Sequence, residues 1–220
     1  MAVSFTEKLK TLFSLVKNPK ELNALLSLRH SGFLMDKGWF HAFNSGEPLD
    51  FYLKPIPWFT YSAVDFLGER LNKKMKILEF GSGNSTLYFG KKVEQVVAVE
   101  HDVNWYNKLE KKIPSNVNLV LSKADSSGSY INPITENKIS FDIIVIDGLF
   151  RNECCKEGME MLSNSGVIIL DDSERTEYKE GINYIISKDF RRIDFWGISA
   201  GYLYSKATSI FYKPSNCLKI

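Results

Sequence analysis

Acidic side chains stand along the middle of this sequence, each at the end of an apolar run. Glu79 precedes a turn that contains two glycines, Gly81 and Gly83, and Glu100 ends the next apolar run. A glycine turn lets the backbone approach a ligand closely. A carboxylate at the tip of the next strand can accept hydrogen bonds from both hydroxyls of a ribose. These residues therefore predict a pocket for a ligand that contains a nucleoside.

A second acidic group follows later apolar runs: Asp147 ends one, and Asp171 and Asp172 follow another. Adjacent parallel strands end side by side, about 5 Å apart, so three carboxylates would crowd one rim. Such crowding is costly unless a cation or protons neutralise it. Oxygen ligands suit Mg²⁺, Mn²⁺ or Ca²⁺, so the group predicts a divalent metal site. The alternative is that Asp172 or Ser173 caps the helix that follows.

The apolar runs alternate with helical patterns from residue 76 onward, and this alternation must position both acidic groups. Strands are expected at 76–80, 95–100, 116–121, 141–147, 166–171, 190–196 and 208–213. Helices are expected at 85–92, 103–113, 151–162 and 174–187. The pattern predicts an α/β fold with a Rossmann-like, doubly wound, seven-stranded sheet. A loop without a helix joins the last two strands, so the sheet should be mostly parallel with its last strand antiparallel.

The first 75 residues have a different pattern. Helices are expected at 4–17 and 20–29, divided by Asn18-Pro19, and again at 58–72, whereas 30–57 reads as irregular because glycine and proline interrupt it. We expect residues 1–75 to form a helical and loop segment packed on the core. Residues 76–220 should form the ligand-binding domain.

The overall composition limits the classes of partner. The net charge is +2, from 28 basic and 26 acidic residues, so a dedicated nucleic-acid binder is not expected. Three cysteines, an odd number, suggest a reduced, cytoplasmic setting. No apolar run approaches the ~18 residues of a membrane span. The first helix is amphipathic, and packing on the domain, contact with a partner or contact with a membrane surface are its alternatives. A homodimer also stays open.

The order of these motifs resembles that of class I S-adenosylmethionine-dependent methyltransferases. The quoted residues are Glu79-x-Gly81-x-Gly83, Glu100, Ala124-Asp125 and Asp147-Gly148, and the resemblance covers residues 58–213. A dinucleotide fingerprint would carry a third glycine where Thr86 stands. The resemblance implies S-adenosyl-L-methionine as cofactor. A sulfonium cation without phosphate also suits a pocket that has carboxylates and no lysine.

The resemblance implies a role for each matching residue. Glu79 would approach the methionine amine, Glu100 would hold the ribose, and Asp125 with Ser126 would face the adenine. The segment at 55–61 would fold over the cofactor, with core anchoring as the alternative for its aromatic residues. The expected cofactor-binding residues are Trp58, Tyr61, Glu79, Gly81, Ser82, Gly83, Ser85, Thr86, Glu100, His101, Asp125, Ser126 and Asp147.

The second acidic group resembles the metal site of catechol-type and macrocin-type O-methyltransferases. In those families a metal holds two substrate oxygens and lowers the pKa of one of them. This sequence departs from the catechol type, because Phe150 stands where that type has a lysine base. Asp147, Arg151 and His41 are therefore the expected catalytic residues, with Asp147, His41 or His101 as base if no metal is present. Arg151 would bind a polar substrate group, since arginine stays protonated.

Together these features predict an enzyme that methylates a hydroxyl group of a small molecule. A sugar or natural product is the first choice of acceptor, because the Asp-Gly-x-x-Arg and Asp-Asp-Ser-x-Arg stretches resemble bacterial methyltransferases of glycan and natural-product pathways. The aromatic loop at 196–204 is expected to form one wall of the acceptor pocket. Two alternatives remain: methylation of RNA or protein, and a non-catalytic subunit that binds the cofactor and a partner.

Overall fold

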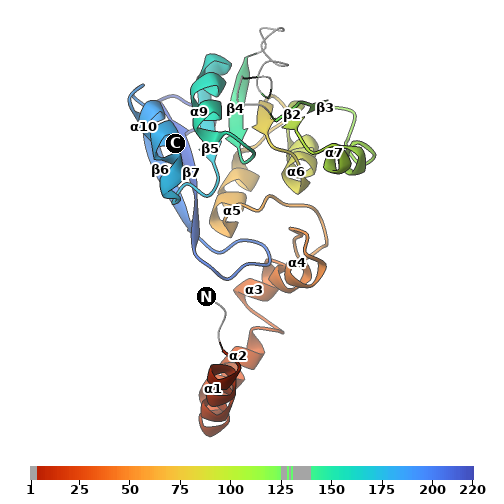
Figure 1. The fold of residues 1–220 in the computed structure, drawn as a ribbon, viewed down its shortest axis with the longest axis vertical. Helices are drawn as coiled ribbons and strands as arrows, with labels where there is room; N and C mark the ends of the chain where they lie inside the picture. The colour runs from red at the N-terminus through yellow and green to blue at the C-terminus, as the bar shows by residue number, and fades with distance from the viewer. Residues whose placement is uncertain (1–3, 125–127, 129, 131–139) are drawn as a thin grey trace.

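A computed structural model describes residues 4–124, 128, 130 and 140–220 of the chain. In this part of the chain seven strands form one sheet in the order β3-β2-β1-β4-β5-β7-β6 (Figure 1). The strands are β1 (Lys76–Phe80), β2 (Gln95–Glu100), β3 (Val117–Leu121), β4 (Phe141–Ile146), β5 (Leu162–Leu170), β6 (Arg191–Gly197) and β7 (Lys206–Tyr212). Strands β3, β2, β1, β4 and β5 pair in parallel. Strand β7 is antiparallel to both β5 and β6. The predicted fold class is confirmed.

The helices follow the strands along the chain. They are α1 (Phe5–Lys17), α2 (Pro19–Ser27), α3 (Phe33–Asp36), α4 (Trp39–Ser45), α5 (Tyr61–Arg70), α6 (Asn84–Lys92), α7 (Val103–Glu110), α9 (Arg151–Glu160), the 3₁₀ turn η1 (Thr176–Tyr178) and α10 (Lys179–Ile186). None of the described helices is both long enough and apolar enough to cross a membrane.

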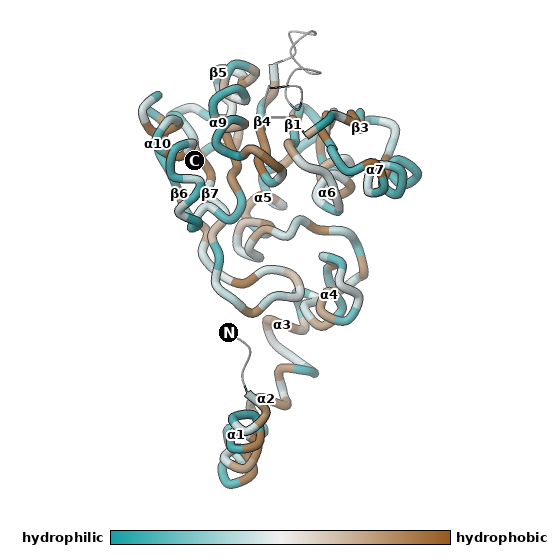
Figure 2. The backbone as a smooth tube through the Cα atoms, in the orientation of Figure 1, coloured by the Kyte–Doolittle hydropathy of each residue, from teal (hydrophilic) through white to brown (hydrophobic). Residues whose placement is uncertain are grey.

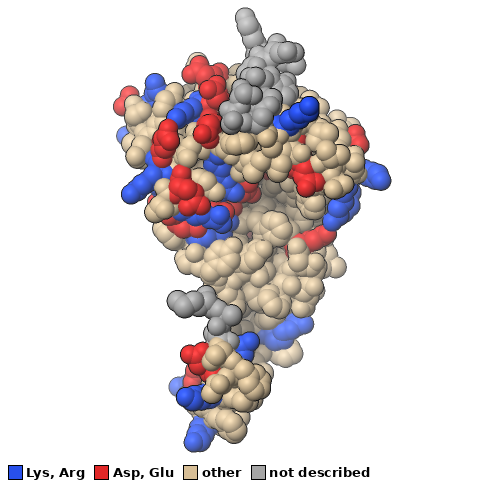
Figure 3. All heavy atoms as spheres, viewed as in Figure 1, with Lys and Arg blue, Asp and Glu red and all other residues tan. Residues whose placement is uncertain are grey.

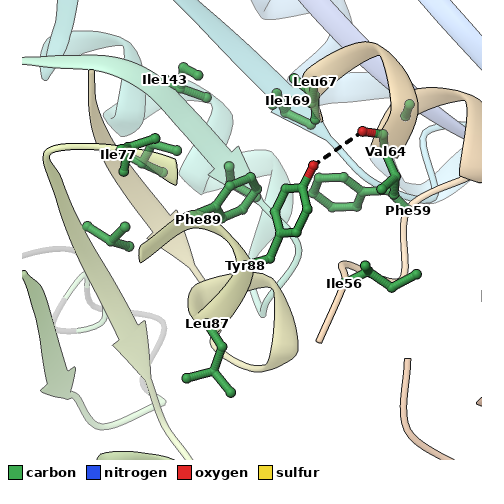
Figure 4. Close-up of a cluster of buried hydrophobic side chains, with 14 of the residues drawn as sticks. Ile56, Phe59, Val64, Leu67, Ile77, Leu87, Tyr88, Phe89, Ile143 and Ile169 are labelled. Carbon is green, nitrogen blue, oxygen red and sulfur yellow. Dashed lines mark hydrogen bonds between the residues drawn. The ribbon is translucent and has the colours of Figure 1, made fainter. Parts of the chain in front are cut away.

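Alternate residues of the central strands enter two different cores, as the two-residue period of a strand requires. Ile77, Ile143 and Ile169 lie in the core beneath α5 and α6. Figure 4 shows these isoleucines facing aromatic side chains of α6, where the Tyr88 hydroxyl donates to the Val64 carbonyl oxygen at 3.3 Å. The other core includes side chains of α9 and α10. The strand interiors are accordingly the most hydrophobic stretches of the domain in Figure 2.

The N-terminal segment divides into two parts with different packing. From α4 onward it contributes buried side chains to the core, among them Trp39, Phe59 and Leu67. Helices α1 and α2 bury no residue, and Figure 1 shows them projecting away from the sheet. The proposed boundary at residue 75 falls just before β1.

Two local predictions need correction. Residues 30–57 are not wholly irregular, because α3 and α4 lie there; glycines with positive φ, Gly38 and Gly46, flank α4 and set its short length. The helix predicted at 174–187 begins later, as η1 followed by α10. Neither Asp172 nor Ser173 caps it: the Ser173 hydroxyl instead donates to the Ala207 carbonyl oxygen on β7.

The order of the strands determines where a ligand can bind. From β1 the chain continues to β2 on one side, and β4 then joins β1 on the other side. In such sheets ligands bind beyond the carboxyl ends of the strands, where the order reverses. The expected crevice therefore lies beyond the ends of β1 and β4.

Candidate functional site

The turn after β1 is held against the turn after β4. Gly81 has a φ of +101°, a conformation that side chains rarely adopt. A Cβ atom on Gly81 would lie 3.0 Å from the backbone nitrogen of Gly148, and one on Gly148 would lie 2.8 Å from the nitrogen of Gly81. The two glycines thus allow the two turns to pack backbone against backbone, which explains the Asp147-Gly148 pair.

Glu79 fixes the start of α6 from below the turn. Its carboxylate accepts hydrogen bonds from the Ser85 hydroxyl and, at 2.6 Å, from the Thr86 hydroxyl. Thr86 Oγ1 also accepts the Gly83 backbone N–H at 3.0 Å. Burial raises the pKa of Glu79 to about 8, although the hydrogen bonds from the two hydroxyls act to lower it. Glu79 therefore shapes the glycine turn and retains a proton near neutral pH.

Glu100 holds the neighbouring turn through neutral donors. One carboxylate oxygen accepts the backbone N–H groups of His101 and Asp102, each at 2.8 Å. The other oxygen accepts the Ser82 hydroxyl at 2.6 Å. The His101 ring also lies close, with Nδ1 3.1 Å from the carboxylate. The turn after β1 and the tip of β2 therefore form one hydrogen-bonded unit.

A cavity of about 510 Å³ opens above these turns. This volume falls within the usual range for small-molecule sites. Trp105 closes one side, and its indole N–H donates to the Ser82 carbonyl oxygen at 3.0 Å. On the side of α4, the Asn84 amide donates to the Pro48 carbonyl oxygen at 3.0 Å. The lining residues are Ser45, Gly46, Glu47, Pro48, Trp58, Ser82, Gly83, Asn84, Ser85, Trp105, Lys108 and Asp147.

A smaller cavity of about 150 Å³ shares Trp58 and Asp147 with the first. The loop between β6 and β7 forms its wall, and the Trp58 indole N–H donates to the Ala200 carbonyl oxygen of that loop at 3.1 Å. The Ser199 hydroxyl is buried and has no hydrogen-bond partner among the described residues. The lining residues are Trp58, Asp147, Asp171, Asp172, Ser199, Tyr202, Tyr204 and Lys206. The predicted aromatic wall thus lies beside Trp58.

The three aspartates of the predicted metal site come together, with a carboxylate oxygen from each within 4.8 Å of the others. Cationic side chains already contact all three. Arg151 lies 3.0 Å from Asp147 and also donates to the Asp171 carbonyl oxygen at 2.6 Å. Lys206 lies 2.5 Å from Asp171 and 2.7 Å from Asp172. The carboxylates therefore form a network of ion pairs. We call Asp147, Asp171, Asp172 and their cationic partners the carboxylate cluster.

The pKa values in this network follow from burial and from the paired charges. Burial raises the pKa of Asp147 and of Asp171 above the usual range. Burial acts in the same sense on Asp172, but Lys206 and the neighbouring arginines outweigh it and lower the pKa of Asp172. Burial also disfavours the charged form of Lys206, yet the two adjacent carboxylates raise the pKa of Lys206 well above its usual range. The ammonium group is thus held in its charged form.

Other predicted site residues lie apart from the two cavities. Tyr61 is buried and lines a separate cavity on the side of α5. The His41 ring lies 6.2 Å from the Phe51 ring and lines neither cavity. Arg151 is mostly buried, and its donors are directed to the ends of β4 and β5. Asp125 and Ser126 lie outside the described residues.

Sequence reasoning missed several lining residues. Lys206 and Thr208 are two residues apart on β7, so both point to the same side of the sheet, toward Asp171. Lys206 precedes the run at 208–213 that was predicted as a strand, so the local pattern gave no signal for it. Trp105 and Ser199 gave no signal either, because each reaches its cavity only through the tertiary fold.

The described fold is that of Rossmann-like methyltransferases. A precorrin-6y C5,15-methyltransferase from Geobacter metallireducens is similar with a TM-score of 0.51 and 14% identity, over 69% of this chain and 87% of that one. A spermidine synthase from Thermotoga maritima has a TM-score of 0.52 and 20% identity, over 68% of this chain and 56% of that one. A precorrin 8w decarboxylase from Methanobacterium thermoautotrophicum has a TM-score of 0.51 and 17% identity, over 73% of this chain and 92% of that one.

Comparisons of sequence give no corresponding match. No protein-family model matches the chain, and no curated protein matches it. At these identities the structural similarity supports the fold alone.

Proposed function

We propose that this protein is an S-adenosylmethionine-dependent methyltransferase with its cofactor in the larger cavity. The observation that carries the proposal is the position of that cavity, which lies where the strand order reverses and is bounded by the glycine turn and Asp147. The cofactor would supply an electrophilic methyl group on a sulfonium. Trp58 lines the cavity, and an aromatic face suits a cation.

The smaller cavity is the proposed acceptor site. It opens beside Asp147, so an acceptor there would meet the cofactor across a shared wall. Its lining combines tyrosine and tryptophan rings with buried hydroxyl and charged groups, which suits a compact polar molecule with several hydroxyls. The unpartnered Ser199 hydroxyl gives one hydrogen-bonding position for such a molecule. A sugar or a natural product with hydroxyl groups therefore remains our proposed acceptor.

Asp147 is the proposed base. Its carboxylate lines both cavities, and Arg151 fixes one of its oxygens at 3.0 Å. A carboxylate whose pKa is raised by burial accepts a proton more readily than one in water. The acceptor hydroxyl would pass its proton to Asp147 while its oxygen takes the methyl group and the carbon–sulfur electron pair stays on sulfur. Positioning of the two reactants supplies the rest of the rate enhancement.

A screen for methyl transfer tests this proposal. Purified protein is incubated with S-adenosylmethionine carrying a labelled methyl group and with sugars, phenolic natural products, RNA or protein. We expect transfer to a small hydroxyl compound. We also expect Asp147→Asn to slow it by about 100-fold or more. Transfer to RNA or protein alone would contradict the proposed acceptor class.

A further inference from the structure

The carboxylate cluster holds as many cationic side chains as carboxylates. Asp147 pairs with Arg151, and Asp172 pairs with Arg175 at 2.9 Å and with Lys206 at 2.7 Å. Lys206 also bridges to Asp171 at 2.5 Å, and only 5% of its side chain is exposed. Three carboxylates therefore face three permanent or near-permanent positive charges, and the repulsion that would call for a metal ion is already balanced.

The fold explains how a lysine reaches this place. Strand β7 runs antiparallel to β5, so its first residues lie at the end of β5 where Asp171 and Asp172 stand. The Ser173 backbone N–H donates to the Ala207 carbonyl oxygen at 3.0 Å, which fixes Lys206 beside the two aspartates. Two residues on, the Thr208 hydroxyl donates to the second oxygen of Asp171 at 2.7 Å. Both oxygens of Asp171 are thus engaged.

This donor set does not fit a divalent metal ion. A metal needs carboxylate oxygens with free lone pairs directed at one point, whereas here an ammonium group occupies that point between Asp171 and Asp172. An incoming ion would have to displace a buried, charged lysine from both partners. We propose that Lys206 takes the place of the divalent cation, as a fixed internal charge that positions Asp171 and Asp172 at the floor of the smaller cavity without metal.

Binding of Mn²⁺, followed by the loss of its free electron paramagnetic resonance signal, tests this proposal directly. It needs neither an acceptor nor a cofactor, so its outcome is separate from that of the methyl-transfer screen. The wild-type chain should show no saturable Mn²⁺ site up to about 1 mM. Lys206→Met, which leaves the carboxylates without their central cation, should gain one site per chain and bind at least about tenfold more tightly than the wild type.

The double variant Lys206→Met with Asp171→Asn serves as the matched control and should lose the gained site. Circular dichroism of each variant reports whether it is folded. A saturable site in the wild type that Asp171→Asn removes would overturn the proposal, and this measurement stands even if Lys206→Met does not fold. A folded Lys206→Met chain that gains no site would also overturn it.

A separate observation concerns helices α1 and α2, which we call the projecting hairpin. With 3.6 residues per turn, Phe5, Leu9, Leu12 and Val16 share one side of α1, and all four are exposed. Phe13, also exposed, borders this stripe. Figure 3 shows the projecting end with a broad uncharged surface beside basic side chains. An exposed apolar stripe of this kind marks an interaction surface.

The charges of the hairpin select its partner. Lys8 lies on one border of the apolar stripe and Lys10 and Lys17 on the other, while Glu7 lies opposite. Residues 4–30 carry five basic and two acidic side chains. Lysines that flank an apolar stripe are the pattern of helices that lie in an anionic lipid surface, whereas two such basic hairpins would repel each other in a dimer. We infer that the hairpin docks the protein on an anionic membrane surface.

Sedimentation with vesicles tests this second inference on the full chain. Vesicles of phosphatidylcholine with 30% phosphatidylglycerol should bind the protein, and pure phosphatidylcholine should bind it far less. Lys10→Gln should weaken binding about fivefold, and Leu12→Ser with Phe13→Ser should abolish it. Because α1 buries no residue, both variants should keep the wild-type circular dichroism spectrum. No binding to either vesicle, or a stable dimer in solution that Leu12→Ser with Phe13→Ser disrupts, would overturn the inference.

Discussion

Two acidic groups stand along the same edge of the sheet, and their partners differ. Glu79 and Glu100 accept hydrogen bonds from hydroxyls and backbone N–H groups around the larger cavity. The carboxylate cluster beside the smaller cavity instead binds arginine and lysine side chains. The residue types are alike, but no described lysine or arginine pairs with Glu79 or Glu100, whereas each carboxylate of the cluster has a cationic partner.

This difference assigns the two groups different work. Glu100 accepts only neutral backbone and hydroxyl donors and holds Ser82, which lines the larger cavity, so a cationic ligand such as S-adenosylmethionine suits this group. A cluster whose charge is balanced from within suits a rigid floor for a neutral, polar acceptor. Changing one member of each group therefore separates the two roles.

The largest effect is expected from Lys206→Met. It leaves two buried carboxylates without their cation, and breaking a buried pair costs about 3–5 kcal/mol in the free energy of unfolding. Urea denaturation measures this. Lys156→Met is the matched control, because Lys156 lies 2.6 Å from Glu180 on the exposed surface and should change stability little. Equal effects of the two substitutions would show that the cluster is no more than a surface pair.

Glu100→Gln should chiefly lower the affinity of the protein for its proposed cofactor. The substitution keeps the shape of the side chain and removes a charged acceptor, a loss of about 1.5–3 kcal/mol. The affinity for S-adenosylmethionine should therefore fall by about 10- to 100-fold, as measured by isothermal titration. Unchanged affinity would remove Glu100 from the cofactor site.

The raised pKa of Glu79 predicts how stability depends on pH. The folded chain keeps this proton up to about pH 8, while the unfolded chain loses it near the ordinary value of 4.5. Between these values the folded state binds more protons, so the free energy of unfolding falls as pH rises, by up to about 1.4 kcal/mol per pH unit. Glu79→Gln should remove this slope in urea denaturation between pH 5 and 8. The same slope in both proteins would assign it to other groups.

The smallest effect is expected from Ser82→Ala. The Ser82 hydroxyl donates to Glu100 at 2.6 Å, and one such bond contributes about 1 kcal/mol. Cofactor affinity should fall by less than tenfold, because the two backbone donors still hold Glu100. A loss as large as that of Glu100→Gln would mean that Ser82 itself binds the ligand.

The sequence predicted the sheet and the glycine turn because both depend on local patterns. Runs such as Val167-Ile-Ile-Leu170 mark strands buried on both faces, and Gly81 stands where the backbone needs a positive φ. The placement of Lys206 could not be predicted in this way. It depends on β7 entering the sheet between β5 and β6, an order that no local pattern encodes. The carboxylates were therefore found, and their cation was missed.

Isothermal titration of the full chain with S-adenosylmethionine tests whether the larger cavity binds the cofactor. We expect one site per chain with micromolar affinity, weakened by Glu100→Gln and unaffected by Lys156→Met. Absence of binding below millimolar concentration would contradict the assignment of the larger cavity and, with it, the proposed enzyme.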